Sequence, residues 1–254
     1  MIVSLPMYDL PEVAAATEAW WQAIRAALRA AGLPAPVLRD QPERDLLAHW
    51  RRPDLLLSQT CGLPYRSVLH DHVELVGTPD FGLEGCQAGH YCSAIVVRAE
   101  DGRRGLHDFD GARLAYNEGI SQSGWAAPLA HAAAAGIRFR TGPRTGAHRL
   151  SMRAVARGEA DLAAIDAVTW RLLRDRDPAA GALRVLDRTA PTPGLPCITA
   201  RGQDAPAIAA ALAEAGERMP AGARDVLGLR GVAAIPSASY LALPIPPLPE
   251  AAHA

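Results

Sequence analysis

Short apolar runs and a long amphipathic segment alternate over the first third of the chain. Residues 2–6 and 54–57 have the length and the apolar character of buried strands. Residues 11–28 place apolar side chains mostly at helical spacing and end at a Gly-Leu-Pro stop, which predicts a helix. Residues 36–38 are expected to form a further strand. This alternation predicts an α/β domain with a mainly parallel sheet.

A second block of the same kind follows a change of pattern in the middle of the chain. Its strand candidates are short apolar runs, and its helix candidates are the Ala-rich segments between them. The strand candidates are residues 113–116, 137–139, 161–165 and 184–186, and the helix candidates are the segment after residue 124, residues 147–156 and residues 167–173.

Two extended, β-rich runs at residues 91–97 and 193–200 separate these blocks from the rest of the chain. If the second run leads back to the first block, the Ala-rich helices of residues 204–227 belong to the same lobe as that block. We therefore expect an α/β protein of two lobes, each a mainly parallel sheet flanked by helices, joined by a two-strand hinge. Lobe 1 would comprise residues 1–92 and 198–254, and lobe 2 residues 93–197. The Pro-rich end beyond Pro236 is expected to be extended, without a fold of its own.

Composition and charge narrow the classes of partner. The formal net charge of -1 and the pI near 6.7 give no electrostatic reason to expect nucleic acid, and all the basic residues are arginine. No segment approaches the roughly 20 apolar residues that span a bilayer, so an integral membrane protein is not expected. The first residues lack a basic region followed by an apolar region and a cleavage site. The protein is thus expected either to work in the cytoplasm or to have lost a leader that Met1 replaces.

The turn after the strand candidate of residues 113–116 carries the sharpest chemical signal. An Asn-Glu-Gly break follows the strand, and the next helix begins with Ser121, Gln122, Ser123 and Gly124. The free N–H groups and the dipole of a helix start favour negative charge, and hydroxyl groups add neutral donors. We therefore predict that this turn binds an anion. The same serines would also serve as an ordinary N-cap.

Polar side chains follow other strand candidates as well. Ser58, Gln59 and Thr60 end the third apolar run, and Tyr8 lies in the loop after the first. Asp166 follows a strand candidate and directly precedes a helix, where it would otherwise act as an N-cap. Ligands in open α/β sheets bind at the carboxyl ends of the strands. These residues are therefore expected to line a cleft, with Asp166 on the lobe that carries the anion turn.

Several segments, which together cover most of residues 50–200, carry a family resemblance. They are residues 54–58 with the loop to Tyr65, residues 91–98, residues 108–116 with the serine turn that follows, and residues 148–161 running into residues 163–166. In these segments the chain resembles the phosphate, phosphite and phosphonate branch of the substrate-binding proteins of ATP-driven importers. That resemblance implies the type II periplasmic-binding fold.

The resemblance also implies a site and a role. In that family the helix start of the second lobe, here Ser121 to Gly124, holds the oxyanion, and Asp166 meets a polar group of the ligand. The resemblance places Tyr65 or Tyr91 in the wall of the site and His148 near the cleft. The implied function is a non-enzymatic solute-binding protein that closes over a phosphate-, phosphite- or phosphonate-like anion, as partner of an ABC-importer permease or as a sensor. No cofactor or metal is implied, and the family location is the periplasm.

One alternative hypothesis is that the serine turn belongs to a hydrolase, with Ser121 as the nucleophile. The run from Gly119 through Ser121 to Ser123 approaches the G-x-S-x-G nucleophile elbow of α/β-hydrolases. Its last residue is serine in place of glycine, and a histidine would have to follow the acidic residue in the chain. Only His253 comes after Asp166 in that order, which argues against this reading.

A metal site is the other alternative. Cys86, His90 and Cys92 lie close together in the sequence and could form a soft N/S site. Their spacing matches no common ligand pattern. A disulfide between Cys86 and Cys92 would explain the pair equally well in an oxidising compartment.

Overall fold

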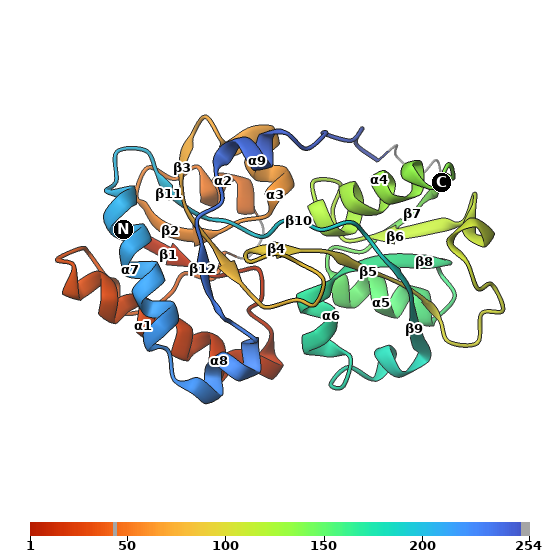
Figure 1. The fold of residues 1–254 in the computed structure, drawn as a ribbon, viewed down its shortest axis with the longest axis horizontal. Coiled ribbons are helices and arrows are strands. Elements are labelled where there is room, and N and C mark those ends of the chain that lie inside the picture. The colour runs from red at the N-terminus through yellow and green to blue at the C-terminus, as the bar shows by residue number, and fades with distance from the viewer. Residues whose placement is uncertain (43–44, 250–254) are drawn as a thin grey trace. The chain divides into compact units, whose positions relative to one another are not determined.

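The computed structural model describes residues 1–42 and 45–249, and these residues fall into two compact units (Figure 1). Unit 1 consists of Met1–His90 and Pro193–Leu243, and unit 2 consists of Tyr91–Thr192 and the C-terminal segment from Pro244. The chain therefore passes between the units three times. The first two passages lie in a separate two-stranded sheet of β4 (His90–Tyr91) and β10 (Thr192–Pro193).

Unit 1 is built on a five-stranded sheet in the order β1-β2-β11-β3-β12. β1 and β2 are parallel, whereas β11 runs antiparallel between β2 and β3, and β12 runs antiparallel to β3. The sheet is thus mixed. Its strands are β1 (Ile2–Ser4), β2 (Leu55–Gln59), β3 (Val73–Asp80), β11 (Cys197–Ala200) and β12 (Gly231–Ala233).

Two groups of helices cover this sheet (Figure 1). One group is α1, with its buried Trp21 and Ile24, packed against α7 and α8. The other group, α2, α3 and α9, encloses a core cluster that includes Trp50, Tyr65 and Tyr240. The bounds are η1 (Pro11–Val13), α1 (Ala14–Ala30), α2 (Leu46–Trp50), α3 (Gly62–Pro64) continuing into η2 (Tyr65–Leu69), α7 (Ala205–Arg218), α8 (Ala221–Leu227) and α9 (Ser237–Leu241).

Unit 2 has its own five-stranded sheet, in the order β7-β6-β8-β5-β9. β6 is parallel to both β7 and β8, and β5 is antiparallel to β8 and β9. Its strands are β5 (Ser93–Arg98), β6 (Arg113–Tyr116), β7 (Arg140–Arg144), β8 (Leu162–Asp166) and β9 (Leu183–Arg188). Its helices and helical turns are η3 (Leu106–Phe109), η4 (Gln122–Ala126) continuing into α4 (Ala127–Ala134), α5 (His148–Ala156), α6 (Ala167–Leu173) and η5 (Pro178–Ala182).

Three local expectations are wrong. Residues 36–38 form no strand, and Val37 and Leu38 are exposed by 67% and 79%. The strand expected at residues 137–139 lies instead at β7, where Arg140 to Arg144 pair with β6. The Pro-rich end contains a helix, α9, because the fully buried Tyr240 anchors it in the core of unit 1.

The C-terminal segment also differs from the expected assignment to the first lobe. Residues 244–249 belong to unit 2. There the indole Nε1 of Trp125 donates a hydrogen bond to the carbonyl of Pro247 at 2.9 Å, and Pro249 lies against Gly119. The last five residues of the expected lobe 1 are residues 250–254, which include His253. They lie outside the described residues.

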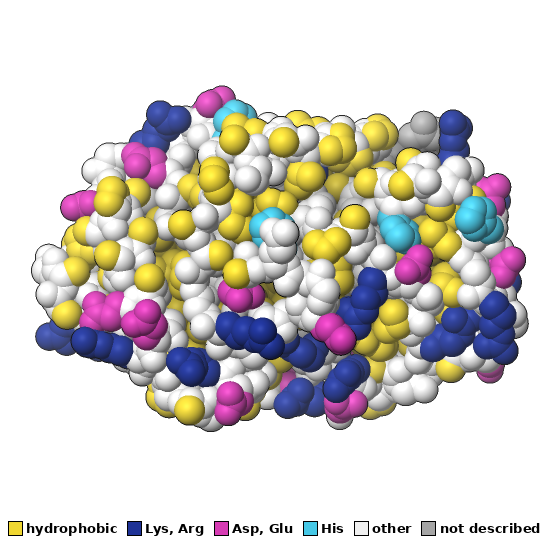
Figure 2. Space-filling view, in the orientation of Figure 1, with side chains coloured by type: hydrophobic (Ala, Val, Ile, Leu, Met, Phe, Trp, Pro, Cys, Tyr) yellow, Lys and Arg dark blue, Asp and Glu magenta, His cyan; other side chains and the backbone are white. Residues whose placement is uncertain are grey.

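Charged side chains of opposite sign are interspersed on the face of the molecule that Figure 2 shows. In Figure 2 the arginine side chains lie among acidic side chains, without an extended area of one sign. Several form ion pairs, such as Arg52 with Asp54 at 2.9 Å and Arg157 with Glu159 at 2.6 Å. This pattern agrees with the near-neutral net charge.

Candidate functional site

The polar strand ends of unit 2 meet at one edge of its sheet. β6 and β8 are parallel neighbours, with Leu114 opposite Leu162 and Ala115 opposite Ala163. Their carboxyl ends therefore lie at the same edge, where β6 is followed by Asn117 and β8 ends at Asp166. The polar ends of two parallel strands therefore lie at one edge of the unit 2 sheet.

The predicted anion turn is the start of a helix. Ser121 has an extended backbone, and its Oγ accepts a hydrogen bond from the backbone N–H of Gly124 at 3.0 Å. The side chains of Gln122 and Ser123 are buried. Ser121 is therefore an N-cap, and it satisfies one of the N–H groups that a helix start leaves without a partner in the helix.

Gly124 leaves room for a close neighbour. A Cβ atom at this position would collide with Oδ1 of Asn117. This amide oxygen is buried and accepts no hydrogen bond from any of the described residues. The glycine thus allows a polar acceptor from the end of β6 to lie against the helix start.

Ser123 and His148 are brought together. Oγ of Ser123 and Nε2 of His148 are 2.9 Å apart, and the hydroxyl of Ser93 donates to the carbonyl of Ser123 at 2.9 Å. His148 is the first residue of α5. Burial lowers the pKa of His148 to about 4, although the backbone of Ala164 acts to raise it. The imidazole is therefore neutral at pH 7.

Asp166 is a second N-cap at the same edge. One carboxylate oxygen accepts hydrogen bonds from the backbone N–H groups of Val168 at 2.8 Å and Thr169 at 3.1 Å. The side chain is buried, and the β5–β8 register places Ser93 opposite Asp166. The carboxylate therefore stabilises the start of α6 and lies beside the strand that holds Ser123 in place.

The polar residues at the end of β2 in unit 1 differ in the hydrogen bonds that their side chains make. Ser58 belongs to a buried network, because its Oγ lies 2.7 Å from Oγ of Ser4 and accepts from Nε1 of Trp50 at 3.1 Å. Gln59 donates to the carbonyl of Leu195 at 3.3 Å. Thr60 is fully buried, and its Oγ1 has no hydrogen-bond partner in the part of the chain that the structure describes.

The three predicted tyrosines are buried. Tyr8 packs edge-on against Phe81, with ring centroids 4.8 Å apart. Tyr65 donates its hydroxyl to Ser237 at 2.9 Å and packs against the ring of Tyr240, so it links η2 to α9 inside unit 1. Tyr91 lies in β4.

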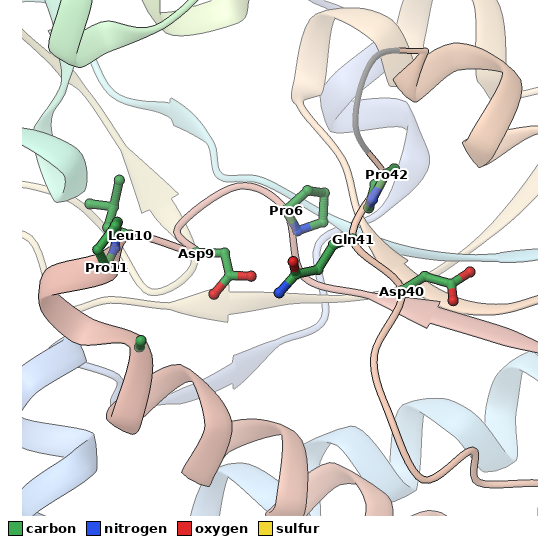
Figure 3. Close-up of a pocket in the computed structure, with 8 residues that line it drawn as sticks. Pro6, Asp9, Leu10, Pro11, Asp40, Gln41 and Pro42 are labelled. Carbon is green, nitrogen blue, oxygen red and sulfur yellow. The ribbon is translucent and has the colours of Figure 1, made fainter.

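A pocket of about 350 Å³ opens in unit 1 beside the loop after β1 (Figure 3). Asp9 and Gln41 point toward the same space from two different loops, and Arg39 donates to the carboxylate of Asp9 at 3.0 Å. The pocket contains none of the predicted site residues. Its lining residues are Pro6, Asp9, Leu10, Pro11, Ala14, Asp40, Gln41 and Pro42.

The sequence reasoning missed two polar residues at the unit 2 edge, Asn117 and Ser93. Asn117 directly follows a strand candidate, which is the signal used for the other site residues and could have identified it. Ser93 lies within a β-rich run, and only its pairing with β8 shows that it is near the helix start.

The residues of the two alternative readings are placed as follows. Oγ of Ser121 accepts from its own helix, whereas the serine that contacts a histidine is Ser123. Among the described residues, no group of three His, Cys, Asp or Glu side chains is placed to hold a metal ion. Cys86 and Cys92 form no disulfide in the described chain.

Two α/β units, each with polar strand ends and linked by short crossings, define the class of two-lobed periplasmic-binding folds. Solved structures of this fold align with most of the chain. XAC2383 from Xanthomonas citri bound to chloride matches with a TM-score of 0.68 and 17% identity over 94% of this chain and 92% of that chain. PhnD1 from Prochlorococcus marinus in complex with methylphosphonate matches with a TM-score of 0.71 and 13% identity over 94% of both chains. A histidine kinase sensor domain with similarity to periplasmic binding proteins matches with a TM-score of 0.61 and 13% identity over 92% of this chain and 97% of that chain.

A match of the sequence to a protein family shows which family the chain belongs to. Residues 57–240 match the periplasmic substrate-binding proteins of phosphonate ABC transporters. This match covers more than half of the chain, and the chain therefore belongs to that family. No protein of curated function matches the sequence. Of the helices in the described residues, none is long and apolar enough to cross a membrane.

Proposed function

We propose that this protein binds a small oxyanion of the phosphate, phosphite or phosphonate class and presents it to an ABC-importer permease in the periplasm. The family supplies the binding role. The ligand class rests on one observation, the helix start at Ser121 to Gly124 at the carboxyl edge of the unit 2 sheet. A sensor role is the second candidate, because a histidine kinase sensor domain shares the fold.

The helix start suits an anion for physical reasons. Gln122 and Ser123 are in the first turn, where backbone N–H groups and the helix dipole favour negative charge. Ser121 caps the N–H of Gly124, which fixes the geometry of the helix start toward which a ligand would be oriented. With His148 neutral, the anion would be held by dipoles and hydrogen bonds and not by a salt bridge to this residue.

Unit 1 would supply the other half of the clamp. Thr60 and Gln59 at the end of β2 and Tyr8 after β1 are the proposed contacts. Ser58 and Tyr65 carry less of the proposal, because their hydroxyl groups are bonded inside unit 1. Closure would follow from a ligand that contacts both units and so binds the closed state better than the open state. This mechanism requires no catalytic step.

A ligand screen by calorimetry and thermal unfolding tests the proposal. The probes are phosphate, phosphite, methylphosphonate, aminoethylphosphonate and sulfate. A ligand present at 100 times its dissociation constant should raise the free energy of unfolding by about 2.7 kcal/mol. If none of these anions stabilises the protein, the proposed function is wrong.

Two matched glycine variants test the helix start. Gly124→Ala places a Cβ against Asn117 and should displace the helix start, so the stabilisation by the bound anion should be lost. Gly102→Ala, in the same unit, has no atom within 4 Å of the added Cβ and should bind as the parent protein does. Equal affinity in both variants would remove the helix start from the site.

A further inference from the structure

Residues 244–249, near the C-terminus, form a proline-rich segment that lies against unit 2. Four of these six residues are proline, at positions 244, 246, 247 and 249. Proline fixes its own φ, restricts the residue before it and has no N–H group, so the segment is stiff. A stiff segment loses little conformational entropy when it docks on a surface. We call residues 244–249 the strap.

The strap contacts unit 2 on both sides of the helix start. Pro249 lies against Gly119, which comes two residues before the N-cap. The carbonyl of Pro247 accepts a hydrogen bond from Nε1 of Trp125 at 2.9 Å, and Trp125 directly follows the last residue of the anion turn. The strap therefore bridges the two ends of residues 119–125, the segment that contains the anion turn.

Gly119 leaves room for the strap. Its φ is not positive, so its backbone conformation does not demand glycine. A Cβ atom at this position would lie 2.6 Å from Cδ and 2.9 Å from Cγ of Pro249, which is too close. The next nearest atom, Cδ2 of Leu248, is 4.0 Å away and also belongs to the strap. A side chain at position 119 would therefore displace the strap first.

Trp125 is held from the other side by the core of unit 2. Its ring packs against Tyr116, with centroids 4.9 Å apart, and both side chains are buried. They belong to a hydrophobic cluster that includes Phe109 and Leu114. A buried indole N–H needs a hydrogen-bond partner, which the carbonyl of Pro247 supplies. The core thus fixes the indole, and the indole fixes the strap.

The loop before the helix start has a second support, at residues 144–146. The backbone N–H of Gly146 donates to the carbonyl of Asn117 at 2.9 Å, and Arg144 forms an ion pair with Glu118. This ion pair is exposed and contributes little to stability. The strap lies further along the loop, where its contacts reach Gly119 and the far end of the anion turn.

We infer that the strap is a positioning element of the anion site, because its contacts with Gly119 and Trp125 hold the helix start in the geometry that binds the oxyanion. This inference rests on the proposed function. A turn that is already fixed loses less conformational entropy when its ligand binds. Coupling between two sites is reciprocal, so a bound anion should also hold the strap more firmly. Trp125 and Pro249 act as positioning residues and do not contact the ligand.

Gly119→Ala is the first test, because the added Cβ displaces the strap. Affinities of the full-length chain for phosphate and for methylphosphonate are measured by calorimetry. We expect both to fall about fivefold or more. Gly102→Ala, in the same unit, has no atom within 4 Å of the added Cβ and should bind as the parent protein does. Equal affinities of the parent protein and Gly119→Ala would overturn the inference.

A second substitution separates displacement of the strap from other effects of the added methyl group. Pro249→Ala removes the Cδ and Cγ atoms that the new Cβ would meet, and it keeps the hydrogen bond between Pro247 and Trp125. The double variant Gly119→Ala/Pro249→Ala should therefore recover most of the affinity that Gly119→Ala loses. Without recovery, the loss belongs to the turn itself and the strap has no role in it.

The indole N–H of Trp125 reports the docking of the strap directly. Its NMR signal, assigned with Trp125→Phe, should exchange slowly with solvent in the parent protein and faster in Gly119→Ala. Saturating methylphosphonate should slow the exchange in the parent protein, by about the factor by which the strap raises the affinity. Exchange that the ligand leaves unchanged contradicts the coupling. The amides of β6 and β8 should exchange alike in both proteins, which excludes a general loosening of unit 2.

The failures are distinguishable. If neither phosphate nor methylphosphonate binds the parent protein, the proposed function is wrong and this inference fails with it. If both anions bind the parent protein and the strap variants alike, the function stands and the role of the strap is wrong. If Gly119→Ala does not fold, Trp125→Phe decides, because it keeps an aromatic ring and removes the N–H donor. Reduced affinity of Trp125→Phe supports the strap, and unchanged affinity refutes it.

Discussion

Single residues cap the helix starts of unit 2 at Ser121 and Asp166. Ser121 and Asp166 were expected to contact a ligand or to act as N-caps, and both are caps. A capping side chain does not exclude a ligand. It satisfies only one or two of the N–H groups of the first helical turn. The sequence could identify these residues but could not determine which partner each would take.

The pKa of His148 has a consequence for stability at the same scale. It is about 4 in the folded protein and 6.5 in the unfolded chain, so the unfolded chain binds more protons between these pH values. This residue should therefore leave stability unchanged above pH 6.5 and lower it as the pH falls toward 4, by at most about 3 kcal/mol.

Urea unfolding measured at pH 7, 6, 5 and 4 checks this expectation. His148→Gln should lose less stability than the parent protein between pH 6.5 and 4. The exposed His107→Gln in the same unit should follow the parent. Burial also lowers the pKa of His49 in unit 1, so only the difference between variant and parent reports on His148. Parallel curves for all three proteins would contradict the burial of a neutral ring.

At the scale of elements, the sequence predicted buried strands well and peripheral segments poorly. β2, β5, β6 and β8 are continuous apolar runs, and their own composition identifies them. Residues 36–38 have similar apolar character but form no strand, and Val37 and Leu38 are exposed. α9 is short and proline-flanked, and only the burial of Tyr240 fixes it. Tertiary contacts, which local patterns do not contain, decide such segments.

Tyr240 should therefore stabilise unit 1 through the hydrogen bonds of its hydroxyl as well as through the burial of its ring. Its hydroxyl lies 2.6 Å from Oγ1 of Thr78 and donates to the carbonyl of Gly194 at 3.1 Å, with the ring fully buried. Tyr240→Phe keeps the ring but leaves buried polar partners unsatisfied, so it should cost about 1–3 kcal/mol in chemical unfolding. Leu241→Ala, next to it and 44% exposed, should cost much less. Equal costs would show that α9 contributes only through apolar contact.

At the scale of the whole molecule, the sequence predicted two units and a discontinuous first one. The two β-rich runs suggested the first and second passages of the chain. The third passage, between Leu243 and Pro244, was missed because it depends on the docking of a proline-rich segment on Trp125. The contacts of this segment with unit 2 include those to Trp125 and Gly119, and the sequence pattern of the segment does not predict them.

Two truncations test how unit 1 depends on its late segment. β11 lies between β2 and β3, which pair with it and not with each other. A chain that ends at Thr192 should therefore lose hydrogen-exchange protection in β2 and β3 while β6 and β8 keep theirs. A chain that ends at Leu243 should keep protection in both sheets. Protection of β2 and β3 in the shorter chain would show that β11 is dispensable.

The position of β11 also determines the order in which the two sheets can form while the chain is synthesised. A ribosome delivers the first 90 residues of unit 1 long before the strand that must enter the middle of their sheet. Unit 2, whose five strands are consecutive, can complete its sheet during that wait. The early strands meanwhile lack their partners β11 and β12, and unpaired strand edges are sites of misassociation. A newly made chain is thus most vulnerable between residue 90 and residue 200, and a holding chaperone would act in that interval.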